Sequence, residues 1–257
     1  MPPSASAPVV APSDHELAGR VATAAGELLV ALRADLEAAR TWPEDVGDAG
    51  DRQAHHLIVD RLREERPDDG LLSEEGRDDL SRLEARRVWI VDPLDGTREY
   101  SEPGRSDWAV HVALTVDGQP VAGAVALPAR GLTLTTAPAP PPVAPHEGPP
   151  RLVVSRSRPP HQALRIREAI GGELLPLGSA GAKAMAVVLG EADVYAHAGG
   201  QYEWDSCAPA AVALAAGLHV SRLDGSPHTY NHRDPWLPDL LICRPELAPA
   251  VLAALGA

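Results

Sequence analysis

The chain has 257 residues, of which 44% are hydrophobic and 23% charged, and its formal net charge at pH 7 is −13. This length is enough for a large core, and the chain contains no run of about 18 apolar residues of the kind that crosses a membrane. The negative charge argues against a nucleic-acid polymer or an anionic membrane as partner. A small phosphorylated partner stays open, because a bound divalent cation reverses the local field. Two cysteines, Cys207 and Cys243, cannot form a disulfide framework and favour a reducing, cytoplasmic location.

Hydrophobic periodicity and turn residues predict a first half in which two helices precede a set of strands. Residues 1–12 are rich in Pro, Ala and Ser, and we expect a disordered tail there rather than a signal peptide. The elements expected after the tail are a helix from Ser13 to about Arg40, a polar loop over 41–50, a helix from Asp51 to before Pro67, a strand over 71–73, a charged and exposed segment over 78–86, a strand over 88–91, a hairpin of 107–116 and 121–127 around Asp117-Gly118, and a strand over 132–135.

Residues 137–150 contain seven prolines in fourteen positions, which is linker composition and marks the expected boundary between two halves. The half before it, 13–136, has an α+β pattern and carries the candidate metal-binding motifs. The half after it, 151–257, alternates strands and helices and carries Asp205 and the candidate substrate contacts. Its expected strands are 152–154, 174–177, 192–196 and 240–243, and its expected helices are 162–170, 180–189, 206–216 and 245–255. Together these patterns predict an α/β protein with a mixed sheet.

The most informative stretch is Val88-Trp-Ile-Val-Asp-Pro-Leu-Asp-Gly-Thr97. Its apolar start predicts a buried strand, and Pro93 is expected to end that strand because proline cannot donate to a ladder. Gly96 permits a sharp turn with exposed N–H groups, which suits a phosphate oxygen. Two carboxylates, Asp92 and Asp95, beside such a turn suit Mg²⁺ and a phosphoryl group together. The alternative is a strand that simply ends in a polar turn.

Three further acids lie where secondary-structure elements are expected to begin or end. Asp51 opens a helix, Glu74 follows a strand, and Asp205 begins a helix. A Mg²⁺ site needs several oxygen ligands from different elements, and these acids are candidates for it. The alternatives are that Asp51 and Asp205 are N-cap residues and that Glu74 belongs to a solvated acidic turn. His228 and His232 lie in a proline-containing segment, for which we favour a surface loop over a metal site.

Ser73-Glu74-Glu75, the stretch from Trp89 to Thr97, and Trp204-Asp205 together resemble the signatures of the inositol monophosphatase family. Members are Mg²⁺-dependent, lithium-sensitive phosphatases. The resemblance implies the layered αβαβα sandwich of the sugar phosphatases, with the site between its two halves, and a homodimer is a further expectation. Residues 42–48 depart from the family pattern, so the resemblance leaves open the degree of lithium sensitivity and whether two or three Mg²⁺ ions bind.

Three segments of the second half resemble the 3′(2′),5′-bisphosphate nucleotidases of the CysQ type within this family. They are Trp204-Asp-Ser-Cys-Ala-Pro209, Gly178-Ser-Ala-Gly-Ala-Lys183 and Ser155-Arg-Ser157. The alternative for Lys183 is a lysine on a helix whose ammonium group reaches solvent. The alternative for Cys207 to Pro209 is that these residues only contribute packing at the start of a helix. Cys207 itself is expected to be a small buried thiol.

The resemblance assigns roles to individual residues. Glu74, Asp92 and the Leu94 carbonyl would bind a first metal, and Asp92, Asp95 and Asp205 a second. The N–H groups of Gly96 and Thr97 would hold the phosphate, and a metal-activated water, positioned by Thr97 and Asp51, would attack in line. The catalytic residues implied are Asp51, Glu74 and Thr97, and the substrate contacts implied are Leu94, Asp95, Gly96, Thr97, Arg98, Ser155, Arg156, Ser179, Lys183 and Asp205. Asp95→Asn is expected to abolish turnover and leave the fold intact.

The function that these features favour is hydrolysis of the 3′-phosphate of 3′-phosphoadenosine 5′-phosphate to AMP and phosphate, which clears a by-product of sulfate assimilation. The same chemistry on inositol 1-phosphate, fructose 1,6-bisphosphate or another sugar phosphate is the alternative. A non-catalytic sensor of a phosphorylated ligand is a more distant one.

Overall fold

The computed structural model describes all residues except 1–10, 79, 145–146, 158 and 257, so most of the expected tail lies outside the described residues. The helices within the described part are α1 (Pro12–Ala38), α2 (Pro43–Glu65), α3 (Thr97–Ser101), α4 (His161–Ile170), α5 (Ala180–Val188), α6 (Glu203–Ala215) and α7 (Ala248–Leu255), with short 3₁₀ turns at Ser81–Glu84, Pro128–Arg130 and Pro245–Leu247. The strands are β1 (Gly70–Ser73), β2 (Arg87–Asp95), β3 (Ala109–Val116), β4 (Gln119–Leu127), β5 (Leu132–Thr135), β6 (Arg151–Ser155), β7 (Glu173–Leu177), β8 (Val194–Tyr202), β9 (His219–Ser221) and β10 (Trp236–Cys243).

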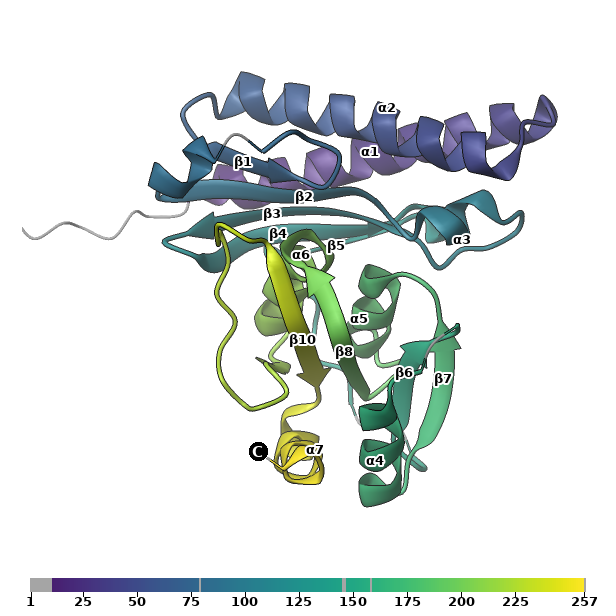
Figure 1. Cartoon of the computed structure of the whole chain (residues 1–257), viewed down its shortest axis with the longest axis vertical. Helices are drawn as coiled ribbons and strands as arrows, with labels where there is room; N and C mark the ends of the chain where they lie inside the picture. The colour runs from purple at the N-terminus through teal and green to yellow at the C-terminus, as the bar shows by residue number, and fades with distance from the viewer. Residues whose placement is uncertain (1–10, 79, 145–146, 158, 257) are drawn as a thin grey trace, which may run out of the picture.

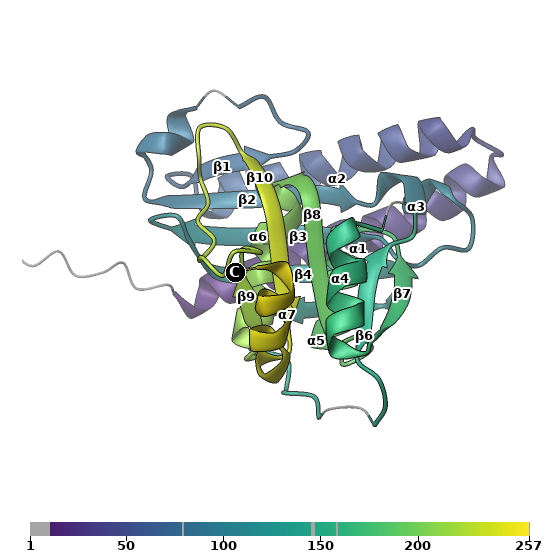
Figure 2. The same cartoon turned by 60° about the horizontal axis from the view of Figure 1, so that its bottom comes forward.

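These elements stack in five layers (Figures 1 and 2). The first sheet has the strand order β1-β2-β3-β4-β5, and the second has the order β7-β6-β8-β10-β9. Helices α1 and α2 cover the outer face of the first sheet, α5 and α6 lie between the sheets, and α4 and α7 cover the second sheet. The mixed α/β fold and its αβαβα layering are therefore as expected from the sequence.

Strand β2 is buried on both faces, which explains its unbroken apolar run. Successive side chains of a strand point to opposite faces, so Trp89 and Val91 pack under α1 and α2, while Val88 and Ile90 pack between the two sheets. Asp92 continues the second series and faces the space between the sheets. The alternation along the strand thus points this carboxylate toward the layer that contains α5 and α6.

The second helix begins at Pro43, and the polar loop expected up to Gly50 is wrong. Proline is well suited to the first turn of a helix, and acidic residues there interact favourably with the helix dipole. The two glycines of this turn are needed for close packing. A Cβ at Gly47 would lie 2.7 Å from the Thr97 methyl group, and one at Gly50 would lie 2.8 Å from the Tyr100 ring. Close packing against α3 therefore favours a helical backbone at Gly47 and Gly50.

Pro93 does not end its strand, because β2 runs on to Asp95. The ladder between β2 and β3 shifts register between Asp92 and Asp95, so the pairing skips the proline, which has no N–H to donate. This irregularity places two carboxylates at the end of one strand.

Several other boundaries differ from the sequence expectations. The segment 78–86 is not fully exposed, since Arg82 is buried and bonds to Asp78 and Asn231. Helix α1 already includes Pro12, α6 begins at Glu203, β10 begins at Trp236, and β9 was not expected. His228 is buried and bonds to the Ser221 carbonyl, so its segment is not a plain surface loop. The expected hairpin of β3 and β4 is confirmed. No helix in the described part of the chain is long and apolar enough to cross a membrane.

Candidate active site

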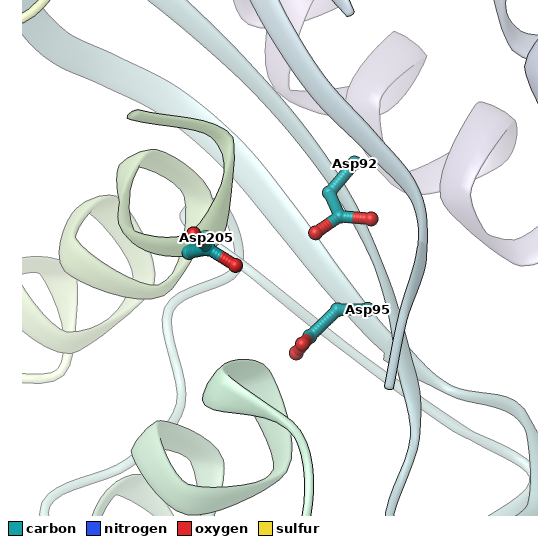
Figure 3. Close-up of side chains that lie close together, drawn as sticks. All are labelled: Asp92, Asp95 and Asp205. Carbon is teal, nitrogen blue, oxygen red and sulfur yellow. The ribbon is translucent and has the colours of Figure 1, made fainter. Parts of the chain in front are cut away.

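Three aspartates meet between the sheets (Figure 3). Asp92 and Asp95 come from the end of β2, and Asp205 comes from the first turn of α6. One carboxylate oxygen from each lies within 4.8 Å of the others. Glu74 follows β1, which pairs in parallel with β2, so its side chain reaches Asp92 as a hydrogen-bond partner. Two carboxylates in such contact share a proton or bind a cation.

The carboxylate of Asp95 joins the end of β2 to the start of α5. It accepts hydrogen bonds from the Ser179 hydroxyl (2.5 Å) and from the backbone N–H groups of Ala180 (3.0 Å) and Gly181 (2.5 Å). His111 Nε2 lies 3.2 Å from the same carboxylate. Burial alone would raise the pKa of Asp95, but His111 and Ser179 lower it below the ordinary value. Asp95 therefore stays ionised and stabilises the helix N-terminus.

Asp205 is tied to its own helix by one oxygen. Its Oδ2 accepts from the backbone N–H of Tyr202 (2.6 Å), which completes a capping arrangement at the start of α6. The alternative that Asp205 is the N-cap residue is wrong, because Tyr202 is the N-cap and Asp205 is the third residue of the helix. The capping bond orients the side chain toward Asp92 and Asp95.

The donor set fits Mg²⁺. Burial and the neighbouring carboxylates raise the pKa of Glu74 to about 7 and that of Asp205 to about 6, and they raise that of Asp92 as well. The raised values reflect the mutual repulsion of these carboxylates and the loss of part of their hydration. Hard oxygen ligands from three elements are what Mg²⁺ prefers, and a divalent cation would offset the repulsion.

Thr97 lies beside the cluster, where β2 turns into α3. The turn uses a positive φ of 89° at Gly96, a conformation that glycine adopts without strain. The Thr97 hydroxyl lies 3.3 Å from Asp51 Oδ1 and 3.2 Å from the Leu94 carbonyl oxygen. Burial and the charges of Glu75 and Asp48 raise the pKa of Asp51 to about 7. This pairing of hydroxyl and carboxylate is able to orient a water and accept its proton.

Two cavities open next to the cluster along β8. The first, of about 440 Å³, is lined by Asp95, Gly96, Asp205, Ser179 and Lys183 together with Tyr195, His197, residues 199–202 and Trp236. The second, of about 510 Å³, shares Lys183 and much of β8 with the first and adds Ser155, Ser157, Pro159 and Pro160. The two adjoining cavities thus leave room for a ligand larger than a phosphate between the cluster and the β6 end.

Lys183 lies at the junction of the two cavities. It is only 7% exposed, so the alternative of a lysine that reaches bulk solvent is wrong. Its Nζ donates to the carbonyl oxygens of Gly178 (3.1 Å) and Ser179 and lies 5.5 Å from the centre of the Tyr195 ring. Burial lowers its pKa. The ammonium is fixed in place at the wall of the site.

The two predicted arginine contacts lie outside these cavities. Arg156 forms ion pairs with Glu99 and Glu102 at 2.6 Å each. Arg98 is exposed and pairs with Glu102. Ser155 does line the second cavity, and its hydroxyl lies 3.3 Å from that of Ser157.

His111 is a site residue that the sequence reasoning missed. It is fully buried, and its Nδ1 donates to the Trp204 carbonyl oxygen at 3.0 Å. Because β3 alternates like β2, His111 faces the space between the sheets with Ala109 and Ala113. The sequence did contain a signal for His111, because it is the one ionisable residue inside an apolar strand. A buried imidazole needs polar partners, so such a residue is expected to lie near other polar groups.

We expect Gly181→Ala to weaken both stability and turnover. A Cβ at Gly181 would lie 2.1 Å from His111 Nε2 and 3.0 Å from Asp95 Oδ2, so the histidine has to move. Overpacking of this kind costs about 1–3 kcal/mol, which outweighs the helix propensity gained with alanine. Gly19→Ala in α1 is the matched control, because its Cβ would meet only a methyl group at 3.2 Å. Urea unfolding and phosphate release check both variants. Equal behaviour of the two would contradict the close packing of His111.

The five-layer fold and the acidic cluster between its sheets define a member of the inositol monophosphatase family. The chain matches the family's sequence profile over residues 14–139 and 151–255, and it belongs to that family.

Named relatives agree with this assignment. The chain is 55% identical over 243 residues to a Mycobacterium bovis protein named 3′-phosphoadenosine 5′-phosphate phosphatase, with 90% of this chain and 89% of the relative covered. It is 32% identical over 209 residues to the 3′(2′),5′-bisphosphate nucleotidase CysQ of Escherichia coli, with 74% and 81% covered. The crystal structure of CysQ from Bacteroides thetaiotaomicron matches with a TM-score of 0.75 at 27% identity, over 90% of this chain and 97% of that one.

Proposed function

We propose that this chain hydrolyses the 3′-phosphate of 3′-phosphoadenosine 5′-phosphate to AMP and phosphate, with Mg²⁺ as cofactor. The observation that carries the proposal is the acidic cluster beside the Gly96 turn, in a chain 55% identical to a phosphatase named for this substrate. A long cavity next to the cluster has room for more than a phosphate.

The residues proposed to hold two or three Mg²⁺ ions are Glu74, Asp92, Asp95, Asp205 and the Leu94 carbonyl. When bound, such ions stabilise negative charge on a phosphoryl group and make a coordinated water more acidic. The chain itself orients its acids by the hydrogen bonds that Asp95 and Asp205 accept from helix N-termini.

Thr97 and Asp51 are proposed to position the attacking water. With its hydroxyl proton directed to Asp51, Thr97 has lone pairs free to accept a hydrogen bond from a water. Asp51 has a pKa near 7 and so is suited to take up a proton at neutral pH. The N–H groups of Gly96 and Thr97 are proposed to bind a phosphate oxygen.

The remaining substrate contacts are proposed along the two cavities. Ser179 and Lys183 lie nearest the cluster, and Ser155 lies in the second cavity. Arg156 would have to break its ion pairs with Glu99 and Glu102 to contact the substrate. We therefore propose that its role is to fix α3 against the end of β6.

The test is phosphate release with Mg²⁺ from 3′-phosphoadenosine 5′-phosphate and from inositol 1-phosphate at equal concentration. We expect a strong preference for the nucleotide and loss of activity with a chelator, restored by added Mg²⁺. A preference for inositol phosphate would leave the metal chemistry standing and move the substrate to the alternative. Calorimetric binding without phosphate release would favour the non-catalytic sensor.

We also propose a reducing, cytoplasmic location, because Cys207 and Cys243 are both buried and unpaired. A homodimer stays a prediction, which sedimentation velocity checks.

A further inference from the structure

Two half-exposed aromatic side chains stand at the rim of the first cavity. Tyr202 ends β8 and Trp236 begins β10, and the two residues are direct partners in the antiparallel ladder. The two strands lie side by side in Figures 1 and 2. Their exposed fractions are 46% and 49%. Both line the cavity that also contains Asp95, Gly96 and Asp205. Direct cross-strand partners project from the same face of a sheet, so both side chains lie on one side of it at this cavity.

Aromatic residues are scarce in this chain, which has five Trp, four Tyr and no Phe. Trp89, Trp108, Tyr100, Tyr195 and Tyr230 are buried. The ring of Tyr202 is held by Trp204, with ring centres 4.7 Å apart and planes at 13°. A preorganised apolar surface that stays half exposed beside a polar site is typical of a ligand contact.

Two glycines keep the floor of this cavity free of side chains. Gly199 and Gly200 have φ values of 102° and 97°, and His197 Nε2 donates to the Gly200 carbonyl oxygen at 2.8 Å. A Cβ at Gly200 would lie 2.6 Å from Trp236 Nε1, whereas one at Gly199 would meet nothing within 4 Å. The indole thus lies directly against the strand, and the space beside it is open to a flat ligand.

A buried amide adds a polar element. Gln201 lines the same cavity, is 6% exposed, and has no hydrogen-bond partner for its Nε2 or Oε1 among the described residues. An unpaired buried amide lowers stability, so it is expected where a bound molecule or water supplies the partner. An amide carries both a donor and an acceptor, as does the edge of adenine.

We propose that Tyr202 and Trp236 form the platform on which the base of the nucleotide stacks, with the Gln201 amide at its edge. The inference rests on the proposed function and identifies what selects a nucleotide over inositol phosphate. The described residues that line this cavity include no arginine, and Lys183 is already bonded to two carbonyls. The rim therefore offers a flat aromatic contact rather than a second phosphate site.

The first experiment compares kcat/KM of Trp236→Ala for 3′-phosphoadenosine 5′-phosphate and for the base-free methyl riboside 3,5-bisphosphate. Alanine substitution under a stacked base costs roughly 5- to 150-fold. We expect that loss with the nucleotide only, and rescue by Trp236→Phe. Leu214→Ala is the control, since it truncates an equally exposed apolar side chain (48%) outside both cavities. Equal losses on both substrates, or no loss, would overturn the platform. A wild-type chain that is inactive on both would overturn the proposed function instead.

A second experiment does not depend on turnover. AMP is titrated into the Mg²⁺-loaded protein, and tryptophan fluorescence is recorded for the wild type and for Trp236→Phe. We expect quenching in the wild type that is largely absent in the variant, although the variant still hydrolyses the nucleotide. Gln201→Leu should weaken AMP binding and raise the midpoint of urea unfolding, because it removes the unpaired amide. Identical quenching with and without Trp236 would place the base elsewhere.

Discussion

Asp95→Asn is expected to lower turnover roughly 10³-fold and to destabilise the fold by about 2–4 kcal/mol. The first effect follows from its place among the proposed metal ligands. The second follows from the structure, because the N–H groups of Ala180 and Gly181 bond to different oxygens of the carboxylate, and an amide would turn its NH₂ group toward one of them. The pKa of Asp95 lies below its ordinary value, so the ionised form stabilises the fold at pH 7 and this contribution is lost only as the pH falls well below 4. The sequence expectation that this variant keeps its fold intact is therefore revised.

The matched control is Asp193→Asn, which alters another buried aspartate. Asp193 accepts from the backbone N–H of Arg151 at 2.7 Å and lines neither cavity of the site. We expect it to lose stability and to keep its kcat at a temperature where it is folded. Urea unfolding and phosphate release separate the two variants. Near-normal turnover in Asp95→Asn would contradict the metal assignment, and an unchanged unfolding midpoint would contradict its capping role.

Thr97→Val is expected to lower kcat roughly 10²- to 10⁴-fold with little change in KM. Valine keeps the shape of threonine and removes the hydroxyl that lies between Asp51 and the Leu94 carbonyl. A loss confined to kcat indicates an interaction made in the transition state. Thr97→Ser is the control, because it keeps the hydroxyl and loses only the methyl group that packs on Gly47. Steady-state phosphate release measures both.

Asp51→Asn tests whether the hydroxyl and the carboxylate act as one unit. Groups that act together lose their effect together, so the Thr97→Val/Asp51→Asn double variant should be scarcely worse than either single variant. If the double variant instead shows the product of the two single losses, the residues act independently and Asp51 does not work through Thr97.

The structure makes the site and the fold depend on each other. Asp95 closes the cluster and also caps α5, and Asp205 does the same for α6. Both helices lie between the two sheets, so the cluster can form only when the halves have packed together (Figure 1). We expect variants in the cluster to show combined losses of stability and activity more often than variants along the cavity rim.

The sequence by itself determined the parts of this protein whose signals are local. The apolar run before Asp92, the Asp117-Gly118 turn and the amphipathic first helix each depend on neighbours in the chain, and each was predicted. The five acids were also predicted, because carboxylates at the ends of elements are visible without knowing how those elements pack. Alternation along β2 further implies which face Asp92 takes.

Only the tertiary structure decided where distant segments meet. The helix α2 continues through Gly47 and Gly50 because both pack closely on α3, and the buried state of Lys183 depends on β8 behind it. His111 becomes a site residue only when α5 brings Gly181 against it. Tyr202 and Trp236 line one cavity only through the pairing of β8 with β10. Each of these contacts joins residues far apart in the chain, and packing and desolvation between such residues leave no periodic signal in the sequence.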